Sequence, residues 1–270
     1  MLCFPYSVQC CLLFIFGTCI GSFLCVCIER WSVNQSVVFP NSHCPFCKKN
    51  IPWSLNIPVI SWLWLRGKTQ CCNKKIPIYY LLCEVFIGLI AVYIFNHSTA
   101  LFIPYFILFC LLWVAFFTDI KAMIIPDEVS LLGLFTGIIL CYFYPELQQQ
   151  TQPLAGFMTS LQAACCSVGG IFIFASIIEY FLKQEAFGLG DVKLIGCIGA
   201  FLGLDACLFS LFAGAILGTI FTFLDYGFRV LVLKQHIQLK HKRIPFGPFL
   251  ASAAVIYMFY ADHFFTHFLN

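Results

Sequence analysis

The stretch LFIPYFILFCLLWVAFF, residues 101–117, contains no charged residue and decides the fold class. Its apolar residues do not alternate with polar ones, as the strands of a membrane barrel would require. An α-helix satisfies its backbone hydrogen bonds within the segment, so an uninterrupted apolar run of this kind crosses a bilayer as a helix. The stretch therefore predicts a helical membrane protein.

The composition of the whole chain agrees with this prediction. Of the 270 residues, 61% are hydrophobic and only 10% are charged. A soluble domain has about 25% charged residues and could not bury so much apolar surface. The composition excludes a soluble enzyme, a disordered chain and a nucleic-acid-binding domain, so we expect the lipid bilayer, and no nucleic acid, as a partner.

Long apolar runs separated by short polar breaks predict an all-α polytopic membrane protein with about eight transmembrane helices, since each span needs roughly 20 residues. No Lys or Arg precedes Arg30, and the first run is long for a signal peptide, so we interpret it as a retained span. The expected spans are residues 7–28, 78–96, 100–118, 129–145, 157–181, 193–209, 211–233 and 247–268.

The positive charges indicate the orientation of these spans. All 15 Lys and Arg residues fall in alternate connecting stretches, and the intervening loops have none. Basic loops stay in the cytoplasm, so both termini are expected to be periplasmic. The largest cytoplasmic loop is predicted at 29–77, and the other basic stretches are 119–128, 182–193 and 229–246.

Carboxylates at the span ends are few, and two of them share one depth in this topology. Asp119 ends the third span, and Asp191 begins the sixth after Gly188 and Gly190. Two neighbouring carboxyl groups cannot both ionise cheaply, so the pair holds one proton and can act as base and acid in aspartic proteolysis. Alternatively, both aspartates are interfacial residues that pair with Lys121 and Lys193.

Motifs along most of the chain resemble those of the prepilin leader peptidases, the GxGD-type aspartic peptidases of bacterial type IV pilus and type II secretion systems. Gly188 to Lys193 is similar to GxGDxK, and Asp119 with Ile125–Pro126–Asp127 is similar to D-x(5-7)-PD. The other matching stretches are Gly21–Leu24 (GSFL), Asn56–Leu63 (NIPVLSWL-like), Arg66–Lys68 (RGK), Glu84, and Pro245–Ala251 (PFGPFLA).

The resemblance implies an enzyme of the inner membrane. It would cut the basic leader from prepilin and pseudopilin precursors at the cytoplasmic face and, in many members, methylate the new N-terminal residue with S-adenosylmethionine. It makes Asp119 and Asp191 the catalytic pair, with Asp127 as the rival for the first role. Gly188, Gly190, Lys193, Asp127 and Glu84 would be supporting motif residues, and the residues that bind the methyl donor stay unassigned.

The same resemblance divides the chain into a first span (1–28), a cytoplasmic cysteine loop (29–77) and a peptidase core (78–270). The basic leader is expected among cytoplasmic carboxylates such as Glu29 and Glu84, together with Glu128. Cys25 and Glu29 depart from the family pattern, which has Asn and Tyr there. Two rival interpretations remain, another class of GxGD intramembrane peptidase and a proton- or ion-coupled transporter, and the oligomeric state is left open.

The cysteine loop predicts a metal site. Cys44 and Cys47 form a CxxC knuckle, whose two thiolates can reach one tetrahedral zinc ion. The family pattern places a second CxxC after Arg-Gly-Lys, where this chain has Thr69 at the expected third cysteine and Cys72 at the fourth. Cys71 or His43 would supply the remaining ligand, and the alternative is a loop without metal.

Overall fold

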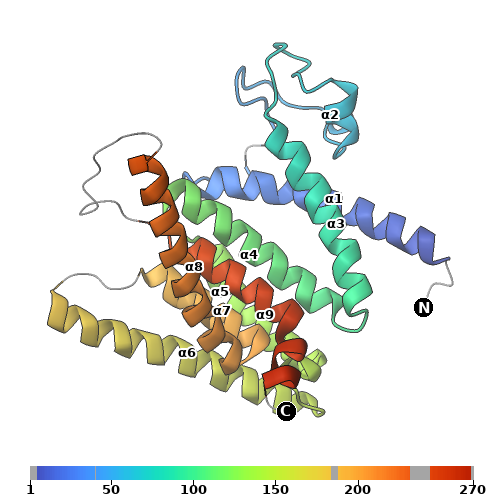
Figure 1. Cartoon of the computed structure of the whole chain (residues 1–270). Coiled ribbons are helices and arrows are strands. Elements are labelled where there is room, and N and C mark those ends of the chain that lie inside the picture. The colour runs from blue at the N-terminus through green and yellow to red at the C-terminus, as the bar shows by residue number, and fades with distance from the viewer. Residues whose placement is uncertain (1–4, 40, 184–187, 232–243, 269–270) are drawn as a thin grey trace. The chain divides into compact units, whose positions relative to one another are not determined.

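The computed structural model describes residues 5–39, 41–183, 188–231 and 244–268, and within them the regular structure is helical (Figure 1). The chain divides into two compact units, unit 1 (Met1–Phe102) and unit 2 (Ile103–Asn270). The long helices are α1 (Tyr6–Trp31), α3 (Ile78–His97), α4 (Phe102–Ala122), α5 (Asp127–Phe143), α6 (Pro153–Leu182), α7 (Leu189–Leu202), α8 (Leu204–Leu231) and α9 (Gly247–Phe268). The short helices are η1 (Trp53–Leu55), α2 (Ile60–Trp64) and η2 (Pro145–Gln148).

Each predicted span corresponds to one of the long helices, so the predicted all-α class is confirmed. Within the described residues, α1, α3, α4, α6 and α8 are long and apolar enough to cross a bilayer. Helices α5 and α7 are shorter, with 17 and 14 residues, and the apolar stretch of α9 that qualifies is Gly247–Tyr260, so the count of eight spans stays a prediction.

The predicted boundary between the sixth and seventh spans was wrong. We expected spans at 193–209 and 211–233, but α7 ends at Leu202 and α8 begins at Leu204. The break falls at Gly203, whose φ of +88° and ψ of 177° are open to glycine and strained for other residues. Asp205 is the one charged residue close to this glycine and its neighbours are apolar, so hydropathy alone placed the break too far along the chain.

Two further differences concern the ends of predicted segments. Helix α4 continues to Ala122, four residues past the predicted limit of 118, so Asp119 lies within the helix. Most of the predicted basic loop 229–246, including Lys234, Lys240 and Lys242, lies outside the described residues, as does Arg243.

Unit 1 is built on a close crossing of α1 and α3. Gly17 and Gly21 stand four residues apart on α1, and a Cβ added to either would lie 2.8–2.9 Å from backbone atoms of α3 at Gly88 and Glu84. Small residues at this spacing let two helix backbones approach in a membrane, where hydrophobic burial does not drive helices together. The glycines therefore set the helix–helix distance in unit 1.

Unit 2 is organised around α7. Every residue from Leu194 to Phe201 is buried, although α7 has only 14 residues. A helix enclosed on all sides must be apolar or small all round. Its neighbours are α5, α6 and α8, and a Cβ added to Gly196 would contact Val168 of α6 and Leu134 of α5.

We predict that Gly17→Ala destabilises unit 1 by about 1–3 kcal/mol, because the added methyl group overpacks the crossing of α1 and α3. Gly169→Ala is the matched control, since nothing lies within 4 Å of a Cβ added there on α6. The measurement is thermal unfolding of both variants in the same detergent. A lower melting temperature for Gly169→Ala than for Gly17→Ala would contradict this account of the crossing.

Candidate active site

Asp119 lies in the last turn of α4 and is 6% exposed. Its Oδ2 accepts a hydrogen bond of 2.9 Å from the backbone N–H of Gly247, the first residue of α9. A Cβ added to Gly247 would lie 2.7 Å from that oxygen, so a side chain there would displace the carboxyl group. A glycine is therefore what allows the start of α9 to hold Asp119.

Asp191 lies in the first turn of α7 and is half-buried. Asp119 is close enough for its charge to act on Asp191, so the end of α4 and the start of α7 meet at one place in unit 2. The N-terminus of a helix carries a partial positive charge that favours a carboxylate. The structure thus brings together the two aspartates that the sequence singled out.

The two glycines before Asp191 have separate roles. A Cβ added to Gly188 would lie 3.2 Å from Oδ2 of Asp191, and one added to Gly190 would lie 3.2 Å from Cβ of Ile125. Gly188 therefore leaves room for the Asp191 carboxyl group, and Gly190 lets the start of α7 approach the segment between α4 and α5. Ile125 is buried and also faces Gly247, so it is the apolar residue against which both glycines pack.

Asp127 and Lys193 form an ion pair beside the two aspartates. Nζ of Lys193 lies 2.6 Å from Oδ1 of Asp127, and the Asp127 side chain is 60% exposed. The pair connects the first turn of α5 with the N-terminal half of α7. The alternative interpretation of the sequence paired Lys193 with Asp191. Because Lys193 pairs with Asp127 instead, that part of the alternative is wrong.

Sequence reasoning did not identify the role of Gly247. The available signal was the Pro245–Ala251 stretch, which matches PFGPFLA but contains no side chain with acid–base chemistry. What this stretch contributes is a backbone N–H, and only the tertiary structure reveals its acceptor.

Unit 1 contains a separate group of four cysteines, Cys44, Cys47, Cys71 and Cys72, whose sulfur atoms all lie within 4.8 Å of one another. The Sγ–Sγ distances are 3.7 Å for Cys44–Cys72, 3.2 Å for Cys47–Cys71 and 3.9 Å for Cys71–Cys72. A tetrahedral zinc ion with Zn–S bonds of about 2.3 Å would set these distances at about 3.8 Å. The four sulfurs could therefore hold a metal ion with little movement.

The backbone of the loop repeats one turn around this group. The N–H of Cys44 donates to the carbonyl of Lys49 over 2.9 Å, and that of Thr69 donates to the carbonyl of Lys74 over 2.8 Å. Thr69 thus occupies the place equivalent to Cys44. Its hydroxyl lies 3.1 Å from the sulfur of Cys72 and accepts the N–H of Lys74.

The sulfur missing at residue 69 is replaced by that of Cys71. His43 is outside the group, because its Nδ1 lies 2.9 Å from the carbonyl oxygen of Asn41. Burial disfavours the Cys44 thiolate, but the backbone N–H groups of Cys47 and Phe46 donate to its sulfur, and the pKa of Cys44 falls to about 6. The side chains of Cys47 and Cys44 instead raise the pKa of Cys71.

Glu84 supports the cysteine loop from α3. It is 9% exposed, and its Oε2 accepts a 2.7 Å hydrogen bond from the N–H of Val59, a residue with a φ of +62°. Glu29 accepts a hydrogen bond from the hydroxyl of Tyr79. Both carboxylates are thus engaged within unit 1, whereas Glu128 at the start of α5 is exposed.

A cavity of about 350 Å³ lies between α1 and the loop in unit 1 and has room for a small molecule. Arg30 lines it and donates to the carbonyls of Ser36 and Val37, with no carboxylate partner among the residues that the structure describes. The remaining polar lining is uncharged and comes from Ser22, Asn41, Ser42 and Asn56. The cavity offers a positive charge and neutral hydrogen-bonding groups.

Comparisons with known proteins identify two family domains in this chain. Residues 15–98 match the bacterial peptidase A24 N-terminal domain, and residues 106–223 match the type IV leader peptidase family. No solved structure matches the chain.

Several curated relatives bear the name prepilin leader peptidase/N-methyltransferase. The protein of Pectobacterium carotovorum is 30% identical over 90% of this chain and 90% of its own length. The Bacillus subtilis protein is 29% identical over 93% and 94%, and the Myxococcus xanthus protein is 33% identical over 76% of this chain and 61% of its own length. By its family matches and by these relatives, the chain belongs to the type IV leader peptidase family.

Proposed function

We propose that this protein is an intramembrane aspartic endopeptidase that removes the leader from prepilins and pseudopilins, with Asp119 and Asp191 as the catalytic pair. The observation that carries the proposal is that Asp191, at the start of α7, lies close enough to Asp119 for their charges to interact, where Gly190 and Gly247 both pack on Ile125. The family and the names of the relatives favour a peptidase over a transporter or another GxGD peptidase class.

The chemistry follows from one proton shared by two carboxyl groups. The ionised aspartate takes a proton from a water molecule, whose oxygen attacks the scissile carbonyl carbon, while the protonated aspartate donates to the carbonyl oxygen. The tetrahedral intermediate then collapses as a proton passes to the leaving amide nitrogen. Gly247 fixes Oδ2 of Asp119 as an acceptor, which leaves Oδ1 to carry the exchanged proton.

The substrate is a precursor with a basic leader followed by an apolar helix. Its helix would lie in the bilayer against the spans, so the bond to be cut falls at the lipid–water boundary. In the bacterial inner membrane, with the pair facing the cytoplasm and both termini periplasmic, the leader would stay on the cytoplasmic side. Glu128 is an exposed carboxylate at the start of α5, next to Asp127, which is already paired with Lys193, so we assign Glu128 to the basic leader.

Methyl transfer to the new N-terminal residue is the second proposed activity, because the relatives' names include it. We assign it to the part of the chain that contains the loop 29–77. The cavity at Arg30 fits the carboxylate of S-adenosylmethionine, although its lining has no acidic side chain for ribose hydroxyl groups. The bound donor would supply the methyl group, and Arg30 would orient its carboxylate.

Zinc is the metal that we propose for the four cysteines. Among the described residues of the loop 29–77 only Cys44 and Gly67 are buried, and Gly67 has no side chain, so the loop lacks a core of its own. A structural metal supplies the folding free energy that burial does not. The residues 78–270 would then form the peptidase core, which needs the metal less.

We predict that Asp119→Asn and Asp191→Asn each lower leader cleavage by at least about 100-fold, because each removes one member of the acid–base pair. Asp127→Asn is the matched control, and it should change the rate by less than about fivefold, since an exposed ion pair contributes about 0–1 kcal/mol. The assay incubates membranes with a prepilin and determines the product N-terminus by mass spectrometry, which also detects methylation. Cleavage lost in Asp127→Asn and kept in Asp119→Asn would exclude our assignment.

We predict that Gly247→Ala lowers cleavage by about 10- to 100-fold with the protein still inserted, because the new methyl group displaces the Asp119 carboxyl. Gly170→Ala should cleave normally, since a Cβ added there meets nothing within 4 Å. The same membrane assay measures both. Unchanged cleavage in Gly247→Ala would show that the contact with Asp119 does not position it for catalysis.

We predict one zinc ion per protein, lost in Cys44→Ser/Cys47→Ser and reduced in Cys71→Ser. His43→Ala and Cys165→Ser, both outside the sulfur group, should keep the metal. Elemental analysis of the purified proteins gives their zinc content. In the cysteine variants, leader cleavage should fall less than methylation. Equal, negligible zinc in the wild type and the double variant would refute the metal, and lost cleavage with normal insertion would assign the loop to the peptidase.

A further inference from the structure

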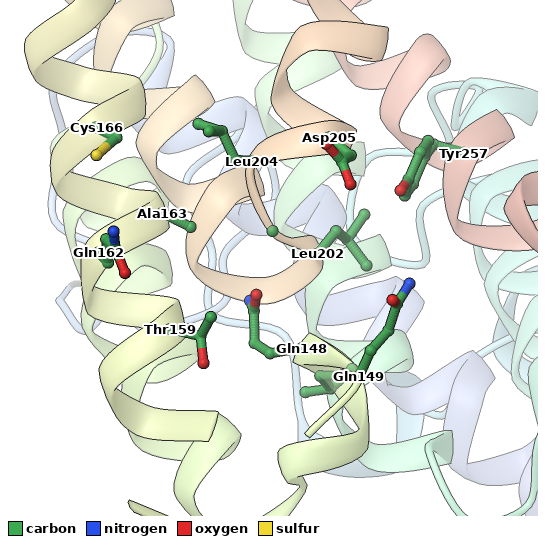
Figure 2. A pocket seen from close by; sticks show the side chains of 12 residues that line it. Gln148, Gln149, Thr159, Gln162, Ala163, Cys166, Leu202, Leu204, Asp205 and Tyr257 are labelled. Carbon is green, nitrogen blue, oxygen red and sulfur yellow. The ribbon is translucent and has the colours of Figure 1, made fainter. Parts of the chain in front are cut away.

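A second cavity, of about 300 Å³, lies in unit 2 beside the C-terminal end of α7 (Figure 2). Asp191 occupies the other end of that helix, so the cavity is separate from the candidate active site. The side chains around it come from η2 and the residue that follows it, and from α6, α7, α8 and α9. In Figure 2, Gln149, Asp205 and Tyr257 lie on one side of Gln148, and Thr159 and Gln162 lie on the other.

The polar side chains at this cavity fall into two groups. Gln148 is buried, and its Nε2 donates to the carbonyls of Gly199 and Ala200, so it caps the end of α7. Gln149, Gln162 and Asp205 are exposed and make no side-chain hydrogen bond or ion pair within the described part of the chain. These three therefore retain their hydrogen-bonding capacity for a ligand.

The charge around the cavity is negative and uncompensated. Asp205 is the one ionisable carboxylate in its lining, and the chain has no Lys or Arg at residues 122–182 or 194–228. An anionic group placed here would face a carboxylate with no cation to offset the repulsion. A cationic group would gain a charge-assisted hydrogen bond.

The surroundings of the cavity are suited to lipid. Leu204 and Leu208 stand one turn apart on α8 beside Asp205 and are 43% and 51% exposed, and Leu161 next to Gln162 is 39% exposed. With 14 residues, α7 is about 21 Å long, against a hydrocarbon thickness of about 30 Å. If the aspartate pair lies at one lipid–water boundary, as proposed above, the cavity is a polar recess within reach of lipid headgroups on the other side.

We propose that this cavity binds the headgroup of a phospholipid with a primary ammonium group, of the phosphatidylethanolamine class. The ammonium hydrogen-bonds to the Asp205 carboxylate and offsets its charge, so the amide N–H of Gln149, on the same side of Gln148, donates to the phosphate oxygens. The acyl chains lie along the exposed leucines of α6 and α8. A quaternary ammonium headgroup has no N–H to donate to Asp205 and binds more weakly.

The test is lipid binding to the full-length, delipidated protein by native mass spectrometry, with phosphatidylethanolamine, phosphatidylcholine and phosphatidylglycerol of identical acyl chains. We expect the wild type to prefer phosphatidylethanolamine by about tenfold, and Asp205→Asn to lose that preference. Glu146→Gln is the control, because Glu146 is an exposed carboxylate of η2 outside the lining. Equal lipid preference in the wild type and Asp205→Asn, or a preference for phosphatidylglycerol, would overturn the proposal.

Two additional measurements define the ligand and the state of the variant. Competition by glycerophosphoethanolamine, which has the headgroup without acyl chains, would indicate that a soluble amine suffices and would overturn the lipid assignment. Asp205→Asn should cleave prepilin normally, since Asp205 is far from the aspartate pair, and normal cleavage also shows that it is folded. Because lipid binding is read without substrate, failure of the proposed peptidase function would leave the result for the cavity unchanged.

Discussion

The enclosure of α7 is the constraint on which the rest of unit 2 depends. A helix buried from Leu194 to Phe201 cannot satisfy its terminal carbonyls with water, so side chains of neighbouring elements do so. Ser160 and Gln148 donate to the carbonyl of Ala200, and the thiol of Cys141 lies 3.2 Å from the same oxygen. The polar residues at this end are therefore part of what fixes α7 in place, and with it the position of Asp191 at the other end.

The same enclosure explains why small residues matter near the candidate site. Helix α7 starts against Ile125 because Gly190 has no side chain, and α9 starts against Asp119 because Gly247 has none. The hydrogen bond from Gly247 then orients a buried carboxyl group that no cation neutralises within the described contacts of unit 2. The proposed chemistry thus rests on backbone approaches as much as on the two carboxylates.

Unit 1 meets a different constraint. Its two long helices pack through glycines, but the loop between them buries few side chains and is held by individual polar contacts. Glu84 binds the backbone at Val59, Arg30 binds carbonyls at Ser36 and Val37, and four sulfur atoms gather at the two turns. Removal of any one of these contacts would destabilise the loop but would remove no contact of the two aspartates, which lie in unit 2.

The sequence by itself determined the helical membrane class, the approximate helix positions and the aspartates and cysteines of interest, because hydropathy and rare residue types are local properties. It also identified Cys71 as one of two candidates, with His43, for the fourth metal ligand. Only the tertiary structure decided that Cys71 joins the group while His43 does not, that Lys193 pairs with Asp127, and that the helix breaks at Gly203. It alone revealed the N–H of Gly247 on Asp119, because a backbone donor has no signature in the sequence and its acceptor lies 128 residues away.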